Sequence, residues 1–270
     1  MPSAAEHHRW NDGYWVSVWR RREPMTAAVT EILLDRLALA PGESVLDIGS
    51  GGGGTAIAAA RLVAPASVVG ADISEPLVGL ARQRVREQQL GNVAFVVADV
   101  QVDPIAGAPF DVALSQFCVM FFDQPVAAFV NIRAQLAPGG RIGFACWQPV
   151  EHNPWHISSV LAAFVPPAPA LAPGASPTGP FTFGDPERVR EILATSGWQN
   201  VERTAHQLVV TVDRDAFVDD EQLRFSGVPE ESIDAARQAV ADRLDPLRTD
   251  DGRIAAPLAF QVFIASASAT

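Results

Sequence analysis

Short, almost wholly apolar runs alternate with amphipathic segments along the first half of the chain. The apolar runs predict strands at 44–48, 68–71, 93–98, 110–115 and 141–147. Apolar residues at helical spacing predict helices at 25–40, 55–63, 75–89 and 126–136. Strands that alternate with helices pair in parallel, and strands buried on both faces are almost entirely apolar. The pattern therefore predicts an α/β fold with a doubly wound sheet.

The pattern changes after the fifth expected strand. Residues 165–180 are rich in proline, alanine and glycine, which predicts an extended surface loop. A helix is expected over 185–196, with Asp185 as its N-cap and Pro186 at its first position.

Two late segments, 201–212 and 255–265, have the pattern of strands. Between them, residues 213–250 form an acidic stretch with helical character, which we expect to be an insertion. We expect residues 25–270 to form a single domain, preceded by an N-terminal segment, 1–24.

A glycine-rich turn follows the first expected strand, where residues 45–55 read VLDIGSGGGGT. Glycine permits a tight turn and lets a ligand approach the backbone closely. Sites for NAD and FAD have similar glycine motifs, so the glycines alone are weak evidence. Asp47 argues against a dinucleotide site, because a carboxylate two residues before the first glycine is unfavourable beside a pyrophosphate. It suits a ligand that carries an amino group and a sulfonium.

Two more aspartates, Asp72 and Asp99, end the second and third expected strands. The carboxyl ends of parallel strands meet at one edge of the sheet, and a carboxylate there accepts hydrogen bonds from ribose hydroxyls. A single aspartate is explained equally well as the cap of the next helix or turn. Three aspartates in phase behind a glycine turn favour a binding site.

These motifs resemble the class I S-adenosylmethionine-dependent methyltransferases, of the subgroup that includes the ubiquinone and menaquinone biosynthesis enzymes. The similarity covers residues 9–155. It includes FDVALS at 110–115, which is similar to the fourth-strand motif, and LAPGGR at 136–141, which is similar to the turn before the fifth strand. The resemblance implies a Rossmann-like sheet of seven strands, mostly parallel with an antiparallel last strand.

The resemblance also implies S-adenosylmethionine as cofactor, S-adenosylhomocysteine as product, and methylation of oxygen, nitrogen or carbon in a small organic acceptor. By the same resemblance, Asp72 binds the ribose and Asp99 contacts the adenine amino group. Gln116 and Phe117 fall where the family's backbone meets the methionine portion. The complete set of expected cofactor-binding residues is Asp47, Gly49, Ser50, Gly51, Gly53, Asp72, Ile73, Asp99, Val100, Gln116, Phe117 and Trp15.

Aromatic residues crowd the N-terminal segment at Trp10, Tyr14, Trp15 and Trp19. One interpretation is a helical lid that folds over cofactor and acceptor and brings aromatic faces near the sulfonium. The other is that Trp15 and Trp19, at i and i+4, pack on the core. Tyr14, the only tyrosine, is a candidate to orient the cofactor carboxylate or the acceptor.

Two histidines, His152 and His156, follow the fifth expected strand near the edge where substrate is expected to enter. One hypothesis is that either of them deprotonates a hydroxyl or amine of the acceptor. The simpler interpretation is a loop histidine held by a hydrogen bond. Methyl transfer is an in-line displacement that needs neither a metal nor a covalent nucleophile, and we expect no metal site.

The composition excludes several classes of protein. The formal net charge is −11, which disfavours binding to nucleic acid. All 20 basic residues are arginine, so a P-loop and a pyridoxal phosphate site, which both require lysine, are excluded.

We expect a cytoplasmic protein. No apolar run reaches the roughly 18 residues that span a bilayer, and the first residues are too polar for a signal peptide. The only cysteines, Cys118 and Cys146, lie in strand-like runs and offer no disulfide framework.

Apolar residues after the fourth strand, among them Phe121 and Phe122, suggest an apolar acceptor, polyketide-like or lipid-like. Core packing explains both phenylalanines equally well. Three alternatives stay open: an enzyme that uses S-adenosylmethionine for another reaction, a nicotinamide-dependent oxidoreductase, and a non-catalytic binding module. We expect a monomer or a homodimer.

Overall fold

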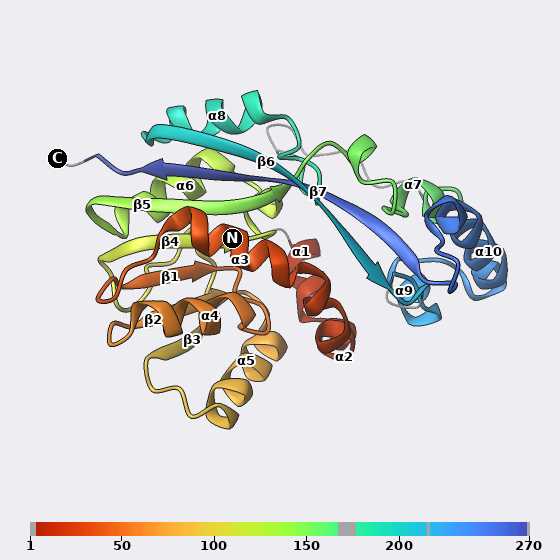
Figure 1. Cartoon of the computed structure of the whole chain (residues 1–270), viewed down its shortest axis with the longest axis horizontal. Coiled ribbons are helices and arrows are strands. Elements are labelled where there is room, and N and C mark those ends of the chain that lie inside the picture. Colours follow the sequence, from red (N-terminus) through yellow and green to blue (C-terminus); the bar gives the residue numbers. More distant parts are fainter. Residues whose placement is uncertain (1–3, 167–176, 215–216, 269–270) are drawn as a thin grey trace.

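The computed structural model describes residues 4–166, 177–214 and 217–268. Its centre is a seven-stranded sheet with the strand order β3-β2-β1-β4-β5-β7-β6 (Figure 1). The strands are β1 (Val45–Ile48), β2 (Val68–Asp72), β3 (Val93–Val97), β4 (Phe110–Gln116), β5 (Leu136–Trp147), β6 (Gln199–Val212) and β7 (Ile254–Ser266). The expected Rossmann-like α/β fold is confirmed.

Strand direction follows the expectation as well. The pairs among β1 to β5 are all parallel, whereas β7 runs antiparallel to both of its neighbours, β5 and β6. In the register of the first three strands, Asp47 lies beside Gly70 and Asp72 beside Val97. The carboxyl ends of β1, β2 and β3 therefore lie together at one edge of the sheet.

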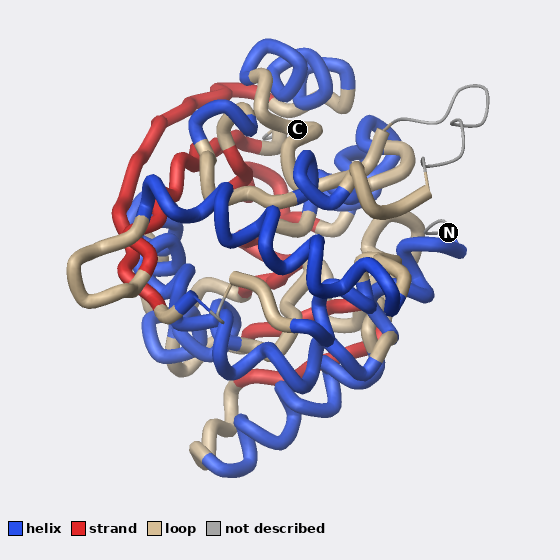
Figure 2. Tube along the Cα trace, turned by 90° about the vertical axis from the view of Figure 1, so that its right-hand side faces the viewer, coloured by secondary structure: helices blue, strands red, loops and turns tan. Residues whose placement is uncertain are grey.

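Helices lie on both sides of the sheet (Figures 1 and 2). They include α3 (Ala27–Leu37), α4 (Gly54–Val63), α5 (Glu75–Glu87), α6 (Pro125–Ala134) and α8 (Pro186–Thr195). Helix α3 packs against α4, and α6 packs against α8. The expected cap of α8 is present, because the Asp185 side chain accepts a hydrogen bond from the Glu187 backbone N–H. No helix in the described ranges has the length and apolar character that a bilayer crossing requires.

Strand β5 begins at Leu136, five residues before the expected start at 141. Its register against β4 shifts between Phe110, which pairs with Leu136, and Val112, which pairs with Arg141. Residues in this irregular stretch include a proline, which lacks a backbone donor, and Gly139 at a φ of +78°. The residues typical of a turn are therefore present, but they lie within the strand and not before it.

The N-terminal segment forms two helices, α1 (Ala4–Asn11) and α2 (Gly13–Arg22), followed by a short 3₁₀ turn, Glu23–Thr26. The segment between β6 and β7 carries α9 (Asp220–Phe225) and α10 (Ile233–Leu244). Helix α2 contacts α9, and α10 contacts the short helix α7 (Ser158–Leu161). Figure 1 shows α7, α9 and α10 at the right-hand end of the molecule and α1 and α2 nearer its middle. Most of the expected proline-rich loop, 165–180, lies outside the described residues.

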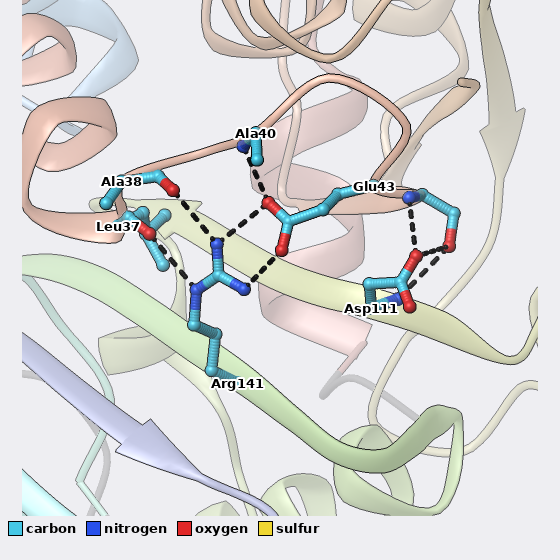
Figure 3. A network of polar contacts seen from close by, with 7 residues as sticks. Leu37, Ala38, Ala40, Glu43, Asp111 and Arg141 are labelled. Atoms are coloured by element: carbon cyan, nitrogen blue, oxygen red, sulfur yellow. Dashed lines mark hydrogen bonds and ion pairs between the residues drawn. The ribbon is translucent and has the colours of Figure 1, made fainter. Parts of the chain in front are cut away.

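A polar network joins the loop before β1 to the starts of β4 and β5 (Figure 3). The Arg141 guanidinium donates to both carboxylate oxygens of Glu43, at 2.6 and 2.9 Å, and to the backbone carbonyls of Leu37 and Ala38. Asp111 accepts hydrogen bonds from the backbone N–H and the hydroxyl of Ser44, each at 2.8 Å. This network lies at the amino edge of the sheet and holds its strands in register.

Candidate functional site

The glycine turn between β1 and α4 has a backbone that only glycine adopts without strain. Gly49, Gly51 and Gly53 have φ values of +68°, +51° and +87°. Space is restricted as well, because a Cβ on Gly51 would lie 2.2 Å from the Trp19 ring. Conformation and packing together therefore require glycine here.

Asp72, at the end of β2, is held in place by the backbone. Its two carboxylate oxygens accept hydrogen bonds from the backbone N–H groups of Gly51 and Ser74, each at 2.8 Å. Burial raises the pKa of Asp72, and these backbone hydrogen bonds oppose the rise. Each carboxylate oxygen has a second lone pair, so the oriented carboxylate can still accept hydrogen bonds from a ligand.

Asp47 lies beneath the glycine turn and is 1% exposed. Burial, and to a lesser degree the charge of Asp72, raise the pKa of Asp47 to about 8, although the backbone N–H of Ala56 favours the ionised form. Its Oδ2 has no hydrogen-bond partner among the described residues, and neither has the buried Ser50 hydroxyl in the turn above. A ligand donor in front of the turn would satisfy the Ser50 hydroxyl, and the positive charge of such a ligand would favour the ionised form of Asp47.

Asp99 follows β3 and accepts hydrogen bonds on Oδ1 from the backbone N–H of Gln101, at 3.1 Å, and from its side-chain amide, at 3.2 Å. The oxygen of the Gln101 amide is bound as well, since Oε1 accepts a hydrogen bond from the Asp123 backbone N–H at 3.0 Å. Asp99 and Gln101 therefore form a fixed polar pair at the carboxyl edge, with the apolar Val100 between them.

These groups face one cavity of about 320 Å³, a volume in the range of small-molecule sites. Of the expected cofactor-binding residues, those on the cavity wall are Trp15, Gly49, Ser50, Gly51, Asp72, Ile73, Asp99, Val100, Gln116 and Phe117. Asp47 and Gly53 are not on the wall. They lie behind it, where one is buried under the turn and the other caps α4.

Helices α1 and α2 cover the cavity with aromatic rings. Trp10 and Trp15 stack at 4.6 Å between centroids, and Phe121 packs edge-on against Trp10 at 5.3 Å. Asn11 ties this cover to the sheet edge, because its side chain donates to the Ile73 carbonyl and accepts from the Glu75 backbone N–H. Trp10 and Trp15 therefore lie on the wall rather than in the core.

A second group of contacts holds α2 down on the glycine turn. The Trp19 indole N–H donates to Glu23 at 3.2 Å, and Glu23 forms an ion pair with Arg84 of α5 at 2.8 Å. Arg84 also donates to the Gly52 carbonyl at 2.6 Å. We call Trp19, Glu23 and Arg84 the lid clasp.

Several wall residues were not expected from the sequence. Thr30 donates to the Gln116 side-chain carbonyl at 2.8 Å, and the Gln116 amide donates to the Thr26 carbonyl at 3.4 Å, so both threonines orient Gln116. Two threonines four residues apart at the start of an apolar helix are the signal that could have been used. The further unexpected wall residues are Glu6, Val18, Arg22, Glu23, Gly54, Thr55, Ala71, Leu77, Ala98, Gln101 and Cys118.

Phe117 marks the junction of the cavity with the core. It has a φ of +58°, which is rare for a residue with a bulky side chain, and its ring stacks on Trp147 at 3.9 Å between centroids. Residues held in such conformations cluster at functional sites. The strain fits a place on the cavity wall.

The three expected catalytic residues are not on the cavity wall. His152 is exposed and its Nδ1 lies 3.2 Å from the Gln148 side-chain oxygen. His156 packs edge-on against Phe181, and burial lowers its pKa to about 4. Tyr14 stacks on Phe225, and burial raises its pKa to about 12, which makes it a poor base at neutral pH. Their catalytic roles stay predictions that this geometry does not favour.

The described residues contain no group of three or more histidine, cysteine, aspartate or glutamate side chains arranged to hold a metal ion. What converges on the cavity is different in kind. A glycine turn, two oriented acids and an aromatic cover suit a ligand with hydroxyls, a flat base and a positive charge.

Comparison with known proteins agrees with this geometry. Residues 45–140 match the family model described as a methyltransferase domain. Nocamycin O-methyltransferase of Saccharothrix syringae is 30% identical over 188 residues, which are 66% of this chain and 67% of that protein. Aklanonic acid methyltransferase of a Streptomyces species is 34% identical over 104 residues, 38% of this chain and 47% of that protein. The chain thus spans about two thirds of the first relative and about half of the second.

A solved structure extends the likeness over most of the fold. The YcgJ protein of Bacillus subtilis superposes with a TM-score of 0.62 at 15% identity, over 89% of this chain and 99% of that one. The matched domain contains the glycine turn, Asp72, Asp99 and strand β4. The match to the methyltransferase model and the similarity to nocamycin O-methyltransferase show that the chain belongs to the S-adenosylmethionine-dependent methyltransferases, enzymes whose methyl donor is S-adenosylmethionine.

Proposed function

We propose that this enzyme transfers the methyl group of S-adenosylmethionine to an oxygen atom of a small, largely apolar, aromatic acceptor. One observation carries the proposal: a single cavity joins the polar wall around Asp72 and Asp99 to an aromatic wall that includes Trp10, Trp15 and Phe121. The names of the relatives, an O-methyltransferase and an aklanonic acid methyltransferase, support oxygen as the methylated atom.

We assign the polar wall to the cofactor. Asp72, with each oxygen already fixed by a backbone N–H, would accept hydrogen bonds from the ribose hydroxyls. Asp99 and Val100, with Ile73, would contact the adenine. Ser50 and Gln116 would bind the amino-acid end, and the unpartnered Ser50 hydroxyl supports this role.

The bound cofactor supplies an activated methyl group, so the protein has to align the acceptor and exclude water. Trp10 and Trp15 close the cavity from above, and Phe117, held on Trp147, closes it from the side. A flat aromatic acceptor would stack on these rings and place its oxygen towards the glycine turn. The described wall residues that could accept a proton from a hydroxyl acceptor are carboxylates and Cys118, so deprotonation would fall to one of these groups or to water.

Incubation with S-adenosylmethionine and a panel of hydroxylated aromatic compounds tests this proposal. We expect S-adenosylhomocysteine and a methyl ether in equal amounts, both measured by mass spectrometry. Methylation confined to nitrogen or carbon would contradict oxygen as the acceptor atom. Conversion of an acceptor without S-adenosylhomocysteine release would mean that the cofactor assists another reaction.

Two wider expectations also belong to this proposal. Cys118 and Cys146 form no disulfide, which supports a cytoplasmic location. Cell fractionation tests that location, and light scattering on the purified protein tests the expected monomer or homodimer.

A further inference from the structure

Arg22, the last residue of α2, is the only basic residue among the described residues of the cavity wall. Its guanidinium carbon lies 5.5 Å from the centre of the Tyr14 ring and 5.9 Å from that of Trp15. One Nη donates to the side-chain oxygen of Gln222 in α9, at 2.5 Å. The side chain is therefore fixed between the two helices rather than free in solvent.

No carboxylate among the described residues forms an ion pair with Arg22. The nearby Asp219 pairs with Arg21, and Glu23 pairs with Arg84 in the lid clasp. The Nε–H of Arg22 is buried and finds no hydrogen-bond partner within residues 4–166, 177–214 and 217–268. Burial lowers the pKa of Arg22, but a guanidinium stays charged at neutral pH. The guanidinium is half-buried and the charge of Asp219 acts favourably on it, so the Nε–H is the part that a ligand anion would satisfy.

A second donor without a partner lies next to it. The indole N–H of Trp15 is buried and makes no hydrogen bond within the described part of the chain. Trp15 also lines the cavity and lies about two helical turns before Arg22 on the same helix. The two N–H groups together match the two oxygens of a carboxylate better than they match a neutral acceptor.

The position of Arg22 separates it from the polar wall. The side chains that contact the glycine turn are those of Trp19 in α2 and of Glu23 just after it. A Cβ on Gly51 would strike Trp19, and a Cβ on Gly54 would strike Glu23. Arg22 instead contacts Tyr14, Trp15 and, through Gln222, the insertion. It therefore faces the aromatic part of the cavity, where the proposed function puts the acceptor.

We propose that Arg22, with the Trp15 N–H, binds a carboxylate of the acceptor, so that the enzyme selects acidic aromatic molecules. This inference rests on the proposed function, because it assigns the aromatic wall to the acceptor. The carboxylate is a binding handle and not the methylated oxygen, since a guanidinium bound to an oxygen lowers its nucleophilicity. A carboxylate of the acceptor would be repelled by Asp72, Asp99 and Glu6, the acids on the same wall, and attracted by Arg22.

Calorimetry on the whole protein, saturated with S-adenosylhomocysteine, tests the inference with 2-naphthoate and its neutral isostere 2-naphthamide. We expect the wild type to bind 2-naphthoate about tenfold more tightly than the amide, as one charge-assisted pair allows. The Arg22→Gln variant should bind both equally, and Arg22→Lys should retain part of the preference. Arg21→Gln is the matched control, because Arg21 pairs with Asp219 away from the wall and the preference should persist.

Equal affinity of the wild type for the two probes, or no binding of 2-naphthoate, would overturn the inference. A second arm measures S-adenosylhomocysteine and 5′-methylthioadenosine, which lacks the amino-acid end. If Arg22→Gln weakens the first ligand more than tenfold and spares the second, Arg22 binds the cofactor's own carboxylate and the acceptor handle is wrong. Failure of the wild type to bind S-adenosylhomocysteine at all would instead contradict the proposed cofactor site.

Discussion

The two edges of the sheet differ in how their polar groups are satisfied. At the amino edge, Arg141 and Glu43 bind one another bidentately, and Asp111 is bound by the backbone and hydroxyl of Ser44. At the carboxyl edge, Asp47 and Ser50 each keep a buried polar atom to which no described residue is hydrogen-bonded. Buried polar groups are usually paired within the protein, so unpartnered ones need an explanation. The polar groups of the amino edge stabilise the fold, whereas those of the carboxyl edge keep hydrogen-bonding capacity that a ligand can use.

The largest effect is expected at Asp72. Asp72→Ala removes a charged acceptor from the proposed ribose site and releases the N–H groups of Gly51 and Ser74. We expect affinity for S-adenosylhomocysteine to fall about 100-fold, as loss of charge-assisted hydrogen bonds of 1.5–3 kcal/mol implies. Calorimetry measures the change. The matched control is Asp242→Ala, on the exposed side of α10, which should bind like the wild type; unchanged affinity in Asp72→Ala would remove the basis of the cofactor assignment.

The opposite pattern is expected at the amino edge. Arg141→Gln leaves Glu43 without its bidentate partner in a place where both side chains are about one quarter exposed. We expect the free energy of unfolding in urea to fall by about 2 kcal/mol, less than for a fully buried pair. Affinity of the folded variant for S-adenosylhomocysteine should stay within about twofold of the wild type. A large loss of affinity with normal stability would contradict the division between the two edges.

The acids of the two edges should also respond differently to pH. The Asp47 carboxyl has its pKa raised to about 8 in the folded protein, above the value of 3.8 that it has when unfolded. Between these values the folded state binds more protons, so stability is present below about pH 4 and is lost as pH rises towards 8. Glu43 behaves oppositely, because the hydrogen bond from Arg141 lowers its pKa and its contribution is lost as pH falls.

Urea unfolding of the ligand-free protein at pH 5 and pH 7 measures this difference. Through Asp47 we expect stability to fall by roughly 2 kcal/mol between the two pH values, because one pKa unit corresponds to about 1.4 kcal/mol. In Asp47→Asn the group no longer titrates, so the fall should shrink relative to the wild type. An identical pH dependence in both proteins would mean that Asp47 is already ionised in the folded state.

The fold was predictable from the sequence because it depends on local signals. Each parallel strand is a short apolar run, and a turn residue or a capped helix follows it. The start of β5 was missed because Pro138 and Gly139 carry the signature of a turn, although the backbone continues through them as an irregular strand. Residues typical of a turn can therefore lie within a paired strand at this place.

The site was predictable only where it follows a strand end. Asp72 and Asp99 were found because parallel strands bring their carboxyl ends together. Arg22 was missed because it reaches the cavity through the placement of α2, which no spacing in the sequence encodes, whereas Thr30 was missed although its spacing from Thr26 is a usable signal. His152 shows the reverse case: it lies after a strand end in the sequence, but its side chain is exposed and is not on the cavity wall, so its catalytic role stays a prediction.

The smallest expected effect concerns the lid clasp. Like the amino edge it contains an ion pair between arginine and glutamate, but this pair holds the helix that covers the cavity. Glu23→Gln would keep the shape of the side chain and remove the ion pair with Arg84, whose members are about one quarter exposed. Partly exposed pairs of this kind contribute at most about 1 kcal/mol, so we expect a two- to fivefold loss of affinity for S-adenosylhomocysteine. The loss should appear as faster dissociation in stopped-flow tryptophan fluorescence, because a loosened lid opens more often. Unchanged dissociation, with unfolding destabilised instead, would place Glu23 among the structural groups and α2 among the fixed parts of the fold.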